Sequence, residues 1–224
     1  MISGWRNLRR MLKEFGVLYS CSLMLHNLIP AQLFYLRAFY LMQTDLYACD
    51  GKEANDPHMR WATQDDTQRI ANMLWDEATI RQHFREGARA VIIEGDDIVK
   101  GCSWFKPSAV SHDHWLKLSI PADTIFSMQT FIRKEERGKQ NFSRMIGFGN
   151  QWAIRQGFKR AVNIVDRLNR NSWTARQRIG GHRVGQIFVI GVAGHLIIRI
   201  GKTWRCGRWN PSNRLLLPFD SAVD

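Results

Sequence analysis

The chain has 224 residues, of which 45% are hydrophobic and 23% are charged, and its formal net charge is +12. This composition excludes a wholly disordered chain, a collagen-like chain and a small disulfide-stapled scaffold. No stretch reaches the roughly 18 uninterrupted apolar residues of a membrane-spanning helix. The four cysteines, at positions 21, 49, 102 and 206, have neither CxxC nor metal-ligand spacing. Together these features predict a cytoplasmic protein without a structural metal site.

The positive charge is concentrated in the last part of the sequence. Residues 131–224 hold 18 basic and 5 acidic residues, which gives this segment a net charge of +13. A one-sided positive field attracts polyanions. Four kinds of partner carry the negative charge that such a field attracts: nucleic acid, an anionic lipid surface, an acidic carrier protein and a multiply phosphorylated cofactor. A basic surface that serves only solubility is the simpler alternative.

Residues 1–56 predict a helical extension and a linker ahead of the main domain. Apolar side chains recur at steps of three and four from position 5 to position 19, with basic side chains elsewhere on the same helix. Pro30 ends this pattern, and a second apolar helix is expected from Ala31 to Met42. A basic amphipathic helix suits a peripheral membrane contact through residues 1–42. Packing on the domain, or in a homodimer, is the alternative.

Residues 57–202 predict one domain in which strands and helices alternate. Its first half is expected to contain a helix capped by Thr63 and Asp66, a helix from Ala78 to Arg85, strands from Ala88 to Glu94 and from Ile98 to Phe105, a loop from Pro107 to Pro121 and a strand from Asp123 to Ile132. Its second half is expected to contain a helix from Gly138 to Gln156, a strand from Ala161 to Val165, a helix capped at Asn169 or Asn171, and a hairpin of strands from Val184 to Ile190 and from His195 to Ile200.

Hairpins followed by strand–helix alternation are typical of an α/β (α+β) fold. The expected fold class is a mixed, mostly antiparallel central sheet flanked by helices. Residues 203–224 are expected to form a basic, aromatic C-terminal tail.

The connection between the strand that ends at Ile132 and the following helix is the best candidate for a binding site. A helix N-terminus presents free N–H groups and the positive end of its dipole, so it binds phosphate. Arg137 and Lys139 add full positive charges, and Gly138 lets the backbone approach a ligand closely. Neither a P-loop nor a dinucleotide-binding glycine fingerprint is present in the sequence.

With these elements in this order, the chain resembles the GNAT acyltransferase superfamily from about Arg60 to Ile200. The family motif Q/R-x-x-G-x-G/A falls on this connection. Arg137 and Gly138 match it, while Gln140 stands in the position of the glycine and Phe142 in that of the last small residue.

A second family motif, N-x-x-A/S-x-x-x-Y-x-x-x-G-F, falls on the next helix. Asn169, Ser172 and Gly180 match it. Arg176 replaces the tyrosine, and Gly181 replaces the aromatic residue. The order of the elements is therefore a better match to the family than either motif.

The resemblance implies that acetyl-CoA or another acyl-CoA binds at the start of the helix. A splayed strand end would supply a backbone N–H, Asn169 would contact the pantetheine or the reacting end of the cofactor, and Arg176 would stabilise a thiolate electrostatically. The cofactor-binding residues implied in this way are Phe131, Ile132, Arg137, Gly138, Lys139, Gln140, Asn141, Phe142, Asn169 and Arg176.

The implied activity is N-acyltransfer, in the simplest case N-acetyltransfer, by direct attack of an amine on the thioester. A base must take a proton from the amine. The family's strand glutamate would fall near Phe126, which is no base. Asp123 lies upstream on the same strand, and His112 and His114 lie in the expected loop before it, so these three are the candidates.

Two other functions remain open on the sequence alone. The first is a non-catalytic, degenerate acyltransferase fold that binds a ligand or partner. The second is a nucleic-acid-binding protein that uses the basic and aromatic residues of positions 199–209, although no nucleic-acid-binding motif is present. One CoA does not need so many basic residues, and an acidic acyl carrier protein or a membrane surface would account for the rest. No motif identifies the amine acceptor.

Overall fold

In the computed structural model, residues 28–30, 33–48, 57–73, 76–95, 98–107, 110–112, 116–208 and 215–218 are described. The amphipathic helix expected over positions 5–19 lies outside these ranges, and so do His114 and most of the expected linker. In the part of the chain that is described, no helix is both long and apolar enough to cross a bilayer.

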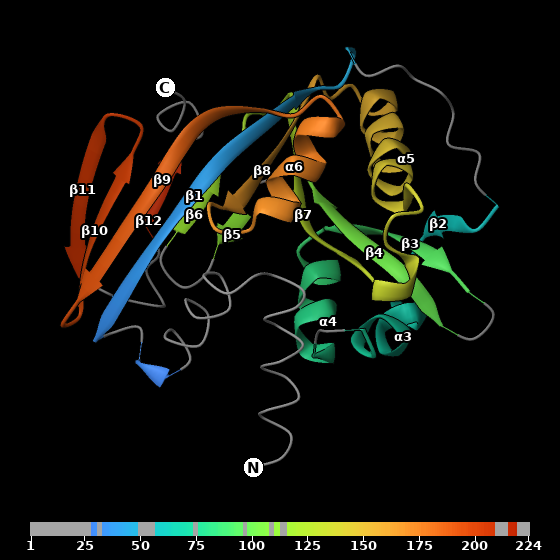
Figure 1. Ribbon diagram of the computed structural model, residues 1–224, viewed down its shortest axis with the longest axis horizontal. Helices are drawn as coiled ribbons and strands as arrows, with labels where there is room; N and C mark the ends of the chain where they lie inside the picture. Colours follow the sequence, from blue (N-terminus) through green and yellow to red (C-terminus); the bar gives the residue numbers. More distant parts are fainter. Residues whose placement is uncertain are drawn as a thin grey trace.

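A nine-stranded sheet forms the centre of the molecule, with the strand order β11-β10-β9-β1-β8-β7-β4-β3-β2 (Figure 1). Its strands are β1 (Phe34–Asp45), β2 (Met59–Trp61), β3 (Arg89–Glu94), β4 (Val99–Lys106), β7 (Thr124–Ile132), β8 (Arg160–Asp166), β9 (His182–Val192), β10 (His195–Ile200) and β11 (Thr203–Arg208). All neighbours are antiparallel except β7 and β8, which run parallel. The expected mixed, mostly antiparallel sheet is therefore confirmed.

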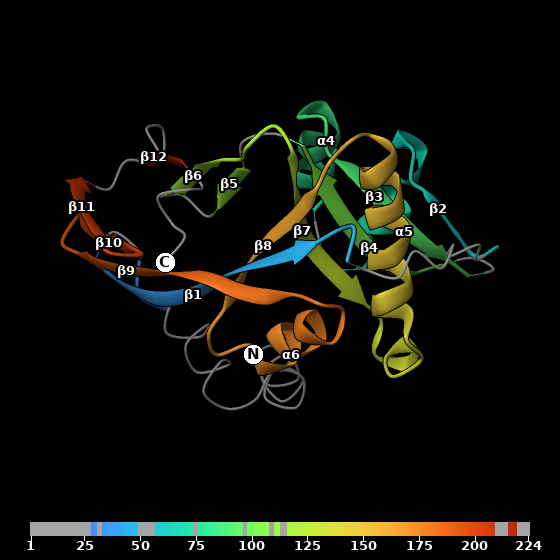
Figure 2. The same cartoon turned by 90° about the horizontal axis from the view of Figure 1, so that it is seen from above.

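Helices cover both faces of the β2–β7 half of this sheet (Figure 2). They are α3 (Thr67–Ala71) and α4 (Glu77–Arg85) on one face and α5 (Asn141–Arg155) on the other. Helix α6 (Arg170–Arg178) lies beside β1, where the ring of Trp173 contacts that of Tyr40, and the 3-10 turns are η1 (Gln64–Asp66) and η2 (Lys134–Glu136). Alternation along β3 separates two cores, because successive side chains of a strand point to opposite faces. Ala90 and Ile92 pack with α3 and α4, whereas Val91 and Ile93 pack with α5.

Strand β1 corrects the expectation of a helix from Ala31 to Met42. It lies between β9 and β8, and it is paired with both along most of its length. A short apolar run fits a buried helix and a buried strand equally well by periodicity. The aromatic side chains of this run, among them the buried Tyr35 and Phe39, favour a strand with neighbours on both edges. The chain segment assigned to the N-terminal extension thus contributes a strand to the middle of the sheet.

A second, three-stranded sheet corrects the loop expected from Pro107 to Pro121. It has the order β12-β6-β5, with β5 (Val110–His112), β6 (Leu116–Ser119) and β12 (Leu215–Pro218). Leu118 of β6 is buried in one core with Tyr35 and Leu196, so the small sheet packs on the β1–β10 half of the large one. Alternation of apolar and polar residues in β6 is the signal that favours a strand there. β11 and β12 also give regular structure to the expected tail.

The close approach of α5 to β4 depends on a glycine. A Cβ at Gly149, in the middle of α5, would overlap the ring of Phe105, which is fully buried on β4. A Cβ at Gly147 on the same helix would meet nothing within 4 Å. Gly149 therefore lets α5 lie directly on the sheet, and this contact sets where the start of α5 stands relative to β7.

We expect Gly149→Ala to destabilise the protein by about 1–3 kcal/mol, because Phe105 and α5 must move apart. The matched control Gly147→Ala removes a helix-interior glycine without a clash and should stabilise by about 0.5–1 kcal/mol. Chemical denaturation of both variants measures the difference. Equal effects of the two substitutions would contradict this account of how α5 is seated.

Candidate functional site

Strands β7 and β8 run side by side only at their starts. Their ladder joins Thr124 to Arg160 and ends at the pair of Phe126 and Val162. Beyond this pair, β7 continues to Ile132 along β4, while β8 continues along β1. In the described part of the chain, the edge of β7 that faced β8 thus has no strand beside it after Phe126. Backbone groups along such an edge are available to a ligand. This is the splayed strand end that was expected near Phe131 and Ile132.

A β-bulge in β7 accompanies the divergence. Trp104 of β4 stands opposite two residues of β7, Met128 and Gln129, between the pairs Ser103–Thr130 and Phe105–Ser127. A bulge increases the local twist and bends the strand that carries it. The bulge lies directly after the last pair with β8, at the point where the two strands part.

The start of α5 lacks a side-chain cap. Its N-cap residue is Gln140, whose backbone is left-handed with φ 59° and ψ 9°. Gly138, two residues earlier, is also left-handed, with φ 81°. The first N–H groups of a helix have no partner within the helix, and they favour an anion. The backbone thus retains the conformation that suits a glycine at position 140, although a glutamine occupies it.

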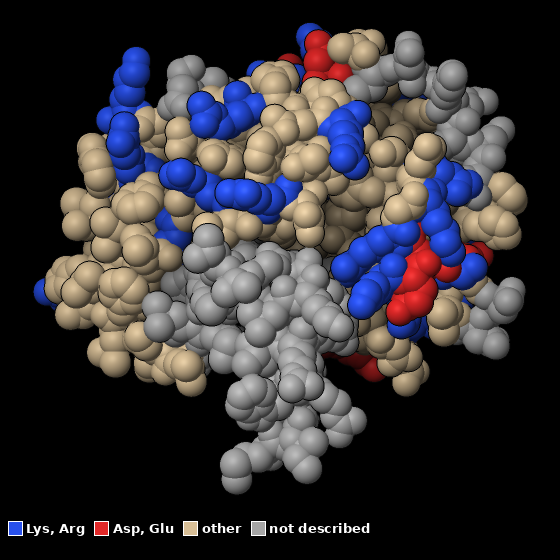
Figure 3. Space-filling model, in the orientation of Figure 1, with Lys and Arg blue, Asp and Glu red and all other residues tan. Residues whose placement is uncertain are grey.

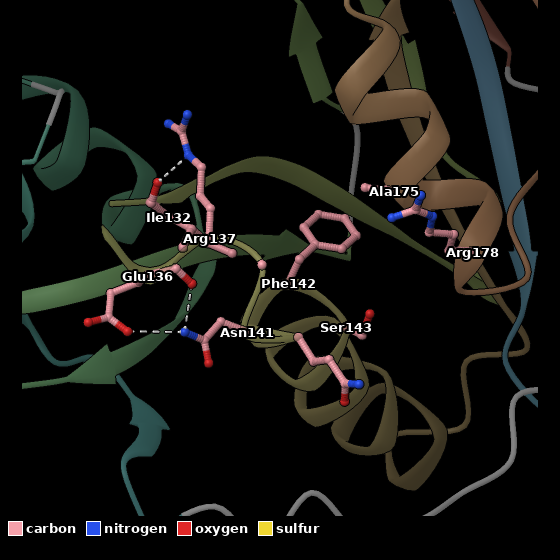
Figure 4. A pocket seen from close by; sticks show the side chains of 10 residues that line it. Ile132, Glu136, Arg137, Asn141, Phe142, Ser143, Ala175 and Arg178 are labelled. Atoms are coloured by element: carbon pink, nitrogen blue, oxygen red, sulfur yellow. Dashed lines mark hydrogen bonds between the residues drawn. The ribbon is translucent and has the colours of Figure 1, made fainter. Parts of the chain in front are cut away.

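A pocket of about 450 Å³ lies between the start of α5 and α6 (Figure 4). Its lining residues are Ile132, Glu136, Arg137, Gly138, Gln140, Asn141, Phe142, Ser143, Ala175 and Arg178. Figure 4 shows Phe142 reaching from α5 toward α6, and Arg178 pointing back from α6. The pocket therefore combines an uncapped helix start with two arginine side chains.

Hydrogen bonds hold the charged residues around this pocket in place. The Nε of Arg137 donates to the backbone oxygen of Ile132 at 3.1 Å. The side-chain amide of Asn141 donates to the backbone oxygen of Glu136 at 3.0 Å (Figure 4). Lys139 forms an ion pair with the Glu136 carboxylate at 3.2 Å. Lys139 thus offsets the one acidic side chain of the lining.

Six of the ten predicted cofactor-binding residues line the pocket, and four do not. Phe131 lies one residue from the lining, beneath the Arg137 guanidinium at 5.9 Å, and Lys139 is in the ion pair described above. Asn169 caps α6, since its Oδ1 accepts from the N–H of Ser172 at 3.1 Å. Sequence reasoning missed four lining residues, Glu136, Ser143, Ala175 and Arg178. Ala175 and Arg178 are variable positions of the family motif, although they share one helix with Arg176.

The two residues that depart most from the family motifs contact each other. The guanidinium of Arg176 lies over the ring of Phe142, 5.1 Å from its centroid. Its Nη2 also donates to the hydroxyl of Thr130 at 3.4 Å, and Thr130 in turn contacts the hydroxyl of Ser103 at 2.8 Å. Arg176 therefore links α6, to which it belongs, with the start of α5 and with the part of β7 that diverges from β8.

Of the predicted bases, Asp123 is described and does not line the pocket, whereas His114 lies outside the described residues. Asp123 precedes β7, at the end of the strand opposite to Ile132, and nine residues of strand span about 30 Å. Its carboxylate forms an ion pair with Arg160 at 2.7 Å, and this arginine lowers the pKa of Asp123. His112 belongs to β5 in the small sheet.

Comparison with solved structures identifies the fold, whereas no protein-family model and no curated protein matches the sequence. A GNAT-family acetyltransferase structure from Novosphingobium aromaticivorans DSM 12444 is similar with a TM-score of 0.53 and 10% identity, over 71% of this chain and 67% of that one. The chain has the fold of the GNAT acetyltransferases. A GNAT acetyltransferase from Colwellia psychrerythraea is similar with a TM-score of 0.50 and 12% identity, over 70% of this chain and 56% of that one.

A third GNAT structure was solved with its cofactor. It is an aminoglycoside N-acetyltransferase in complex with CoA, with a TM-score of 0.44 and 11% identity, and the match covers 55% of this chain and 89% of that one.

We expect Gln140→Gly to stabilise the protein by about 1 kcal/mol. Glycine removes the cost of a left-handed backbone, which exceeds the extra freedom that it gives the unfolded chain. Gln140→Val should destabilise, since a β-branched side chain tolerates this conformation poorly. Thermal unfolding of both variants provides the comparison. A stabilising Gln140→Val would show that this residue is not left-handed in solution.

Proposed function

We propose that the protein is an acyl-CoA-dependent N-acyltransferase, which moves an acyl group from CoA to an amine. One observation carries the proposal. The only parallel pair in the large sheet, among the described strands, opens after Phe126 and Val162, and the uncapped start of α5 and its pocket lie where β7 ends. The GNAT fold supports the same function.

The residues around the pocket fit CoA by charge and by backbone geometry. The first N–H groups of α5 would hold the pyrophosphate, with Arg137 and Arg178 beside it. A Cβ at Gly138 would meet nothing within 4 Å, so the backbone is open to a ligand there. The unpaired edge of β7 would receive the amide groups of the pantetheine arm.

When bound, acyl-CoA supplies a thioester whose carbonyl carbon an amine attacks directly. The chain's part is to place that carbonyl and to polarise it. A backbone N–H on the open edge of β7 would donate to the carbonyl oxygen, where negative charge develops. Helix α5 fixes the other end of the ligand, because its contact through Gly149 seats it on β4. Holding both ends keeps the thioester in one position for attack.

Basic side chains extend beyond the pocket. Figure 3 shows Lys and Arg side chains in a band across the face on which α6, β1 and β9 lie in Figure 1. Arg167 and Arg183 both lie over the ring of Tyr40 on β1, at 5.7 and 5.5 Å. Such a surface would attract the polyanionic CoA, or an acidic acyl carrier protein as an alternative donor, and binding should weaken as salt rises.

The first test is isothermal titration of the protein with acetyl-CoA at two salt concentrations. We expect one-to-one binding and a loss of about tenfold or more in affinity for Arg137→Glu, since a cation beside the phosphates becomes an anion. Lys134→Glu is the matched control, because it makes the same charge change on η2 outside the pocket lining. It should change the affinity by less than about threefold.

Release of free CoA in the presence of a panel of amines then tests turnover. Normal acetyl-CoA binding by Arg137→Glu would contradict the proposed site. Saturable binding without turnover would favour a non-catalytic ligand-binding fold. Binding of DNA or RNA that is steeply salt-dependent and unaffected by CoA would favour the nucleic-acid-binding function instead.

A further inference from the structure

Among the described residues, Arg176 is a buried cation without a counter-charge. The residue is 5% exposed, and its Nε has no hydrogen-bond partner within the described part of the chain. Its contacts in the described part of the chain are the hydroxyl of Thr130, at 3.4 Å from Nη2, and the ring of Phe142. Neither group carries a negative charge. Burial lowers the pKa of the Arg176 guanidinium to about 10, so the group is still charged at neutral pH.

A buried charge of this kind is costly unless it is paired. Charged side chains in protein interiors normally have a partner of opposite sign, because the loss of hydration is otherwise uncompensated. The unsatisfied Nε and the weakly bonded Nη2 form one edge of the guanidinium plane. Two parallel N–H groups on such an edge match the two oxygens of a carboxylate. This edge therefore has the geometry that binds a carboxylate, and no described residue places a carboxylate on it.

The position of Arg176 indicates which part of a ligand reaches it. Ala175, the preceding residue, and Phe142, on which Arg176 lies, both line the pocket at the start of α5. Thr130 belongs to the part of β7 that has parted from β8. Phosphate groups held at the start of α5 would be met by Arg137 and Arg178 instead. A ligand that ran from the helix start along the open edge of β7 would bring its far end to Arg176.

We infer that the acyl group carried by the donor ends in a second carboxylate, and that Arg176 binds this carboxylate. The inference rests on the proposed function, and it names the donor as the CoA thioester of a dicarboxylic acid. A thioester is itself neutral, and the thiolate exists only once the C–S bond has broken. Neither pairs with Arg176 while the donor is bound, whereas a terminal carboxylate does.

The experiment measures the affinity of matched pairs of donors by isothermal titration. Malonyl-CoA is compared with propionyl-CoA, succinyl-CoA with butyryl-CoA, and glutaryl-CoA with pentanoyl-CoA. In each pair a methyl group replaces the terminal carboxylate. We expect at least one dicarboxylic donor to bind about ten- to a hundredfold more tightly than its partner, as a charge-assisted bidentate contact would give.

Two variants assign this selectivity to Arg176. Arg176→Met keeps most of the volume and should reduce the ratio within the selective pair to about one. Arg178→Met, on the same helix and in the pocket lining, should weaken both donors of a pair alike and leave the ratio unchanged. Removing an unpaired buried charge should leave the melting temperature of the free protein unchanged or raise it. Should Arg176→Met fail to fold, Arg176→Lys is the second variant. Lysine keeps the charge but lacks the paired N–H donors of a guanidinium, so it should reduce the affinity ratio within the selective pair in part.

Three results would overturn the inference and leave the proposed function standing. The first is equal affinity within all three pairs while acetyl-CoA binds. The second is a selectivity that persists in Arg176→Met. The third is a variant that binds every donor normally but turns all of them over more slowly, which would assign Arg176 to the leaving thiolate. If no CoA thioester binds at all, the proposed function fails, and this inference fails with it.

Discussion

The site depends on the way in which one pair of strands parts. A parallel ladder joins β7 and β8 for three residue pairs, and then each strand follows its other neighbour, β4 or β1. The bulge at Met128 and Gln129 bends β7 at this point. Everything assigned to the site lies along or beyond the opening: the free edge of β7, the start of α5 and the inner side of α6. Without the divergence, the same residues would form a closed sheet with no room for a ligand.

The start of α5 has a backbone conformation that suits glycine, although another residue occupies the position. Gln140 has the left-handed conformation of a glycine, and Gly138 has it as well. Phe142 fills space that a small residue would leave open, and the side chain that meets its ring is Arg176. Phe142 and Arg176 therefore interact as a pair, because the face of the Phe142 ring partly compensates the buried charge of Arg176.

Sequence reasoning predicted the elements that follow a local rule and missed those that depend on distant partners. The helix capped at Asn169 and the hairpin of β9 and β10 were predicted because caps, turns and alternation are local signals. Strand β1 was taken for a helix, since its neighbours are more than a hundred residues away in the chain. The part of the pocket lining between the end of β7 and the first turn of α5 was predicted, because a helix start is a local signal. The unpaired state of Arg176 was not, because a missing counter-charge is visible only once the surrounding side chains are in place.

The central place of β1 has a consequence for how the molecule is made. Residues 34–45 leave a ribosome early, yet both neighbours of this strand, β8 and β9, belong to the second half of the chain. Contacts of such long sequence separation form late and slowly, because the loop that they close is long. During synthesis, an apolar and aromatic strand must therefore wait with both edges unpaired, which is the condition in which chains aggregate or recruit chaperones. Since β8 also borders the opening beside β7, the candidate site forms only after β8 has been made.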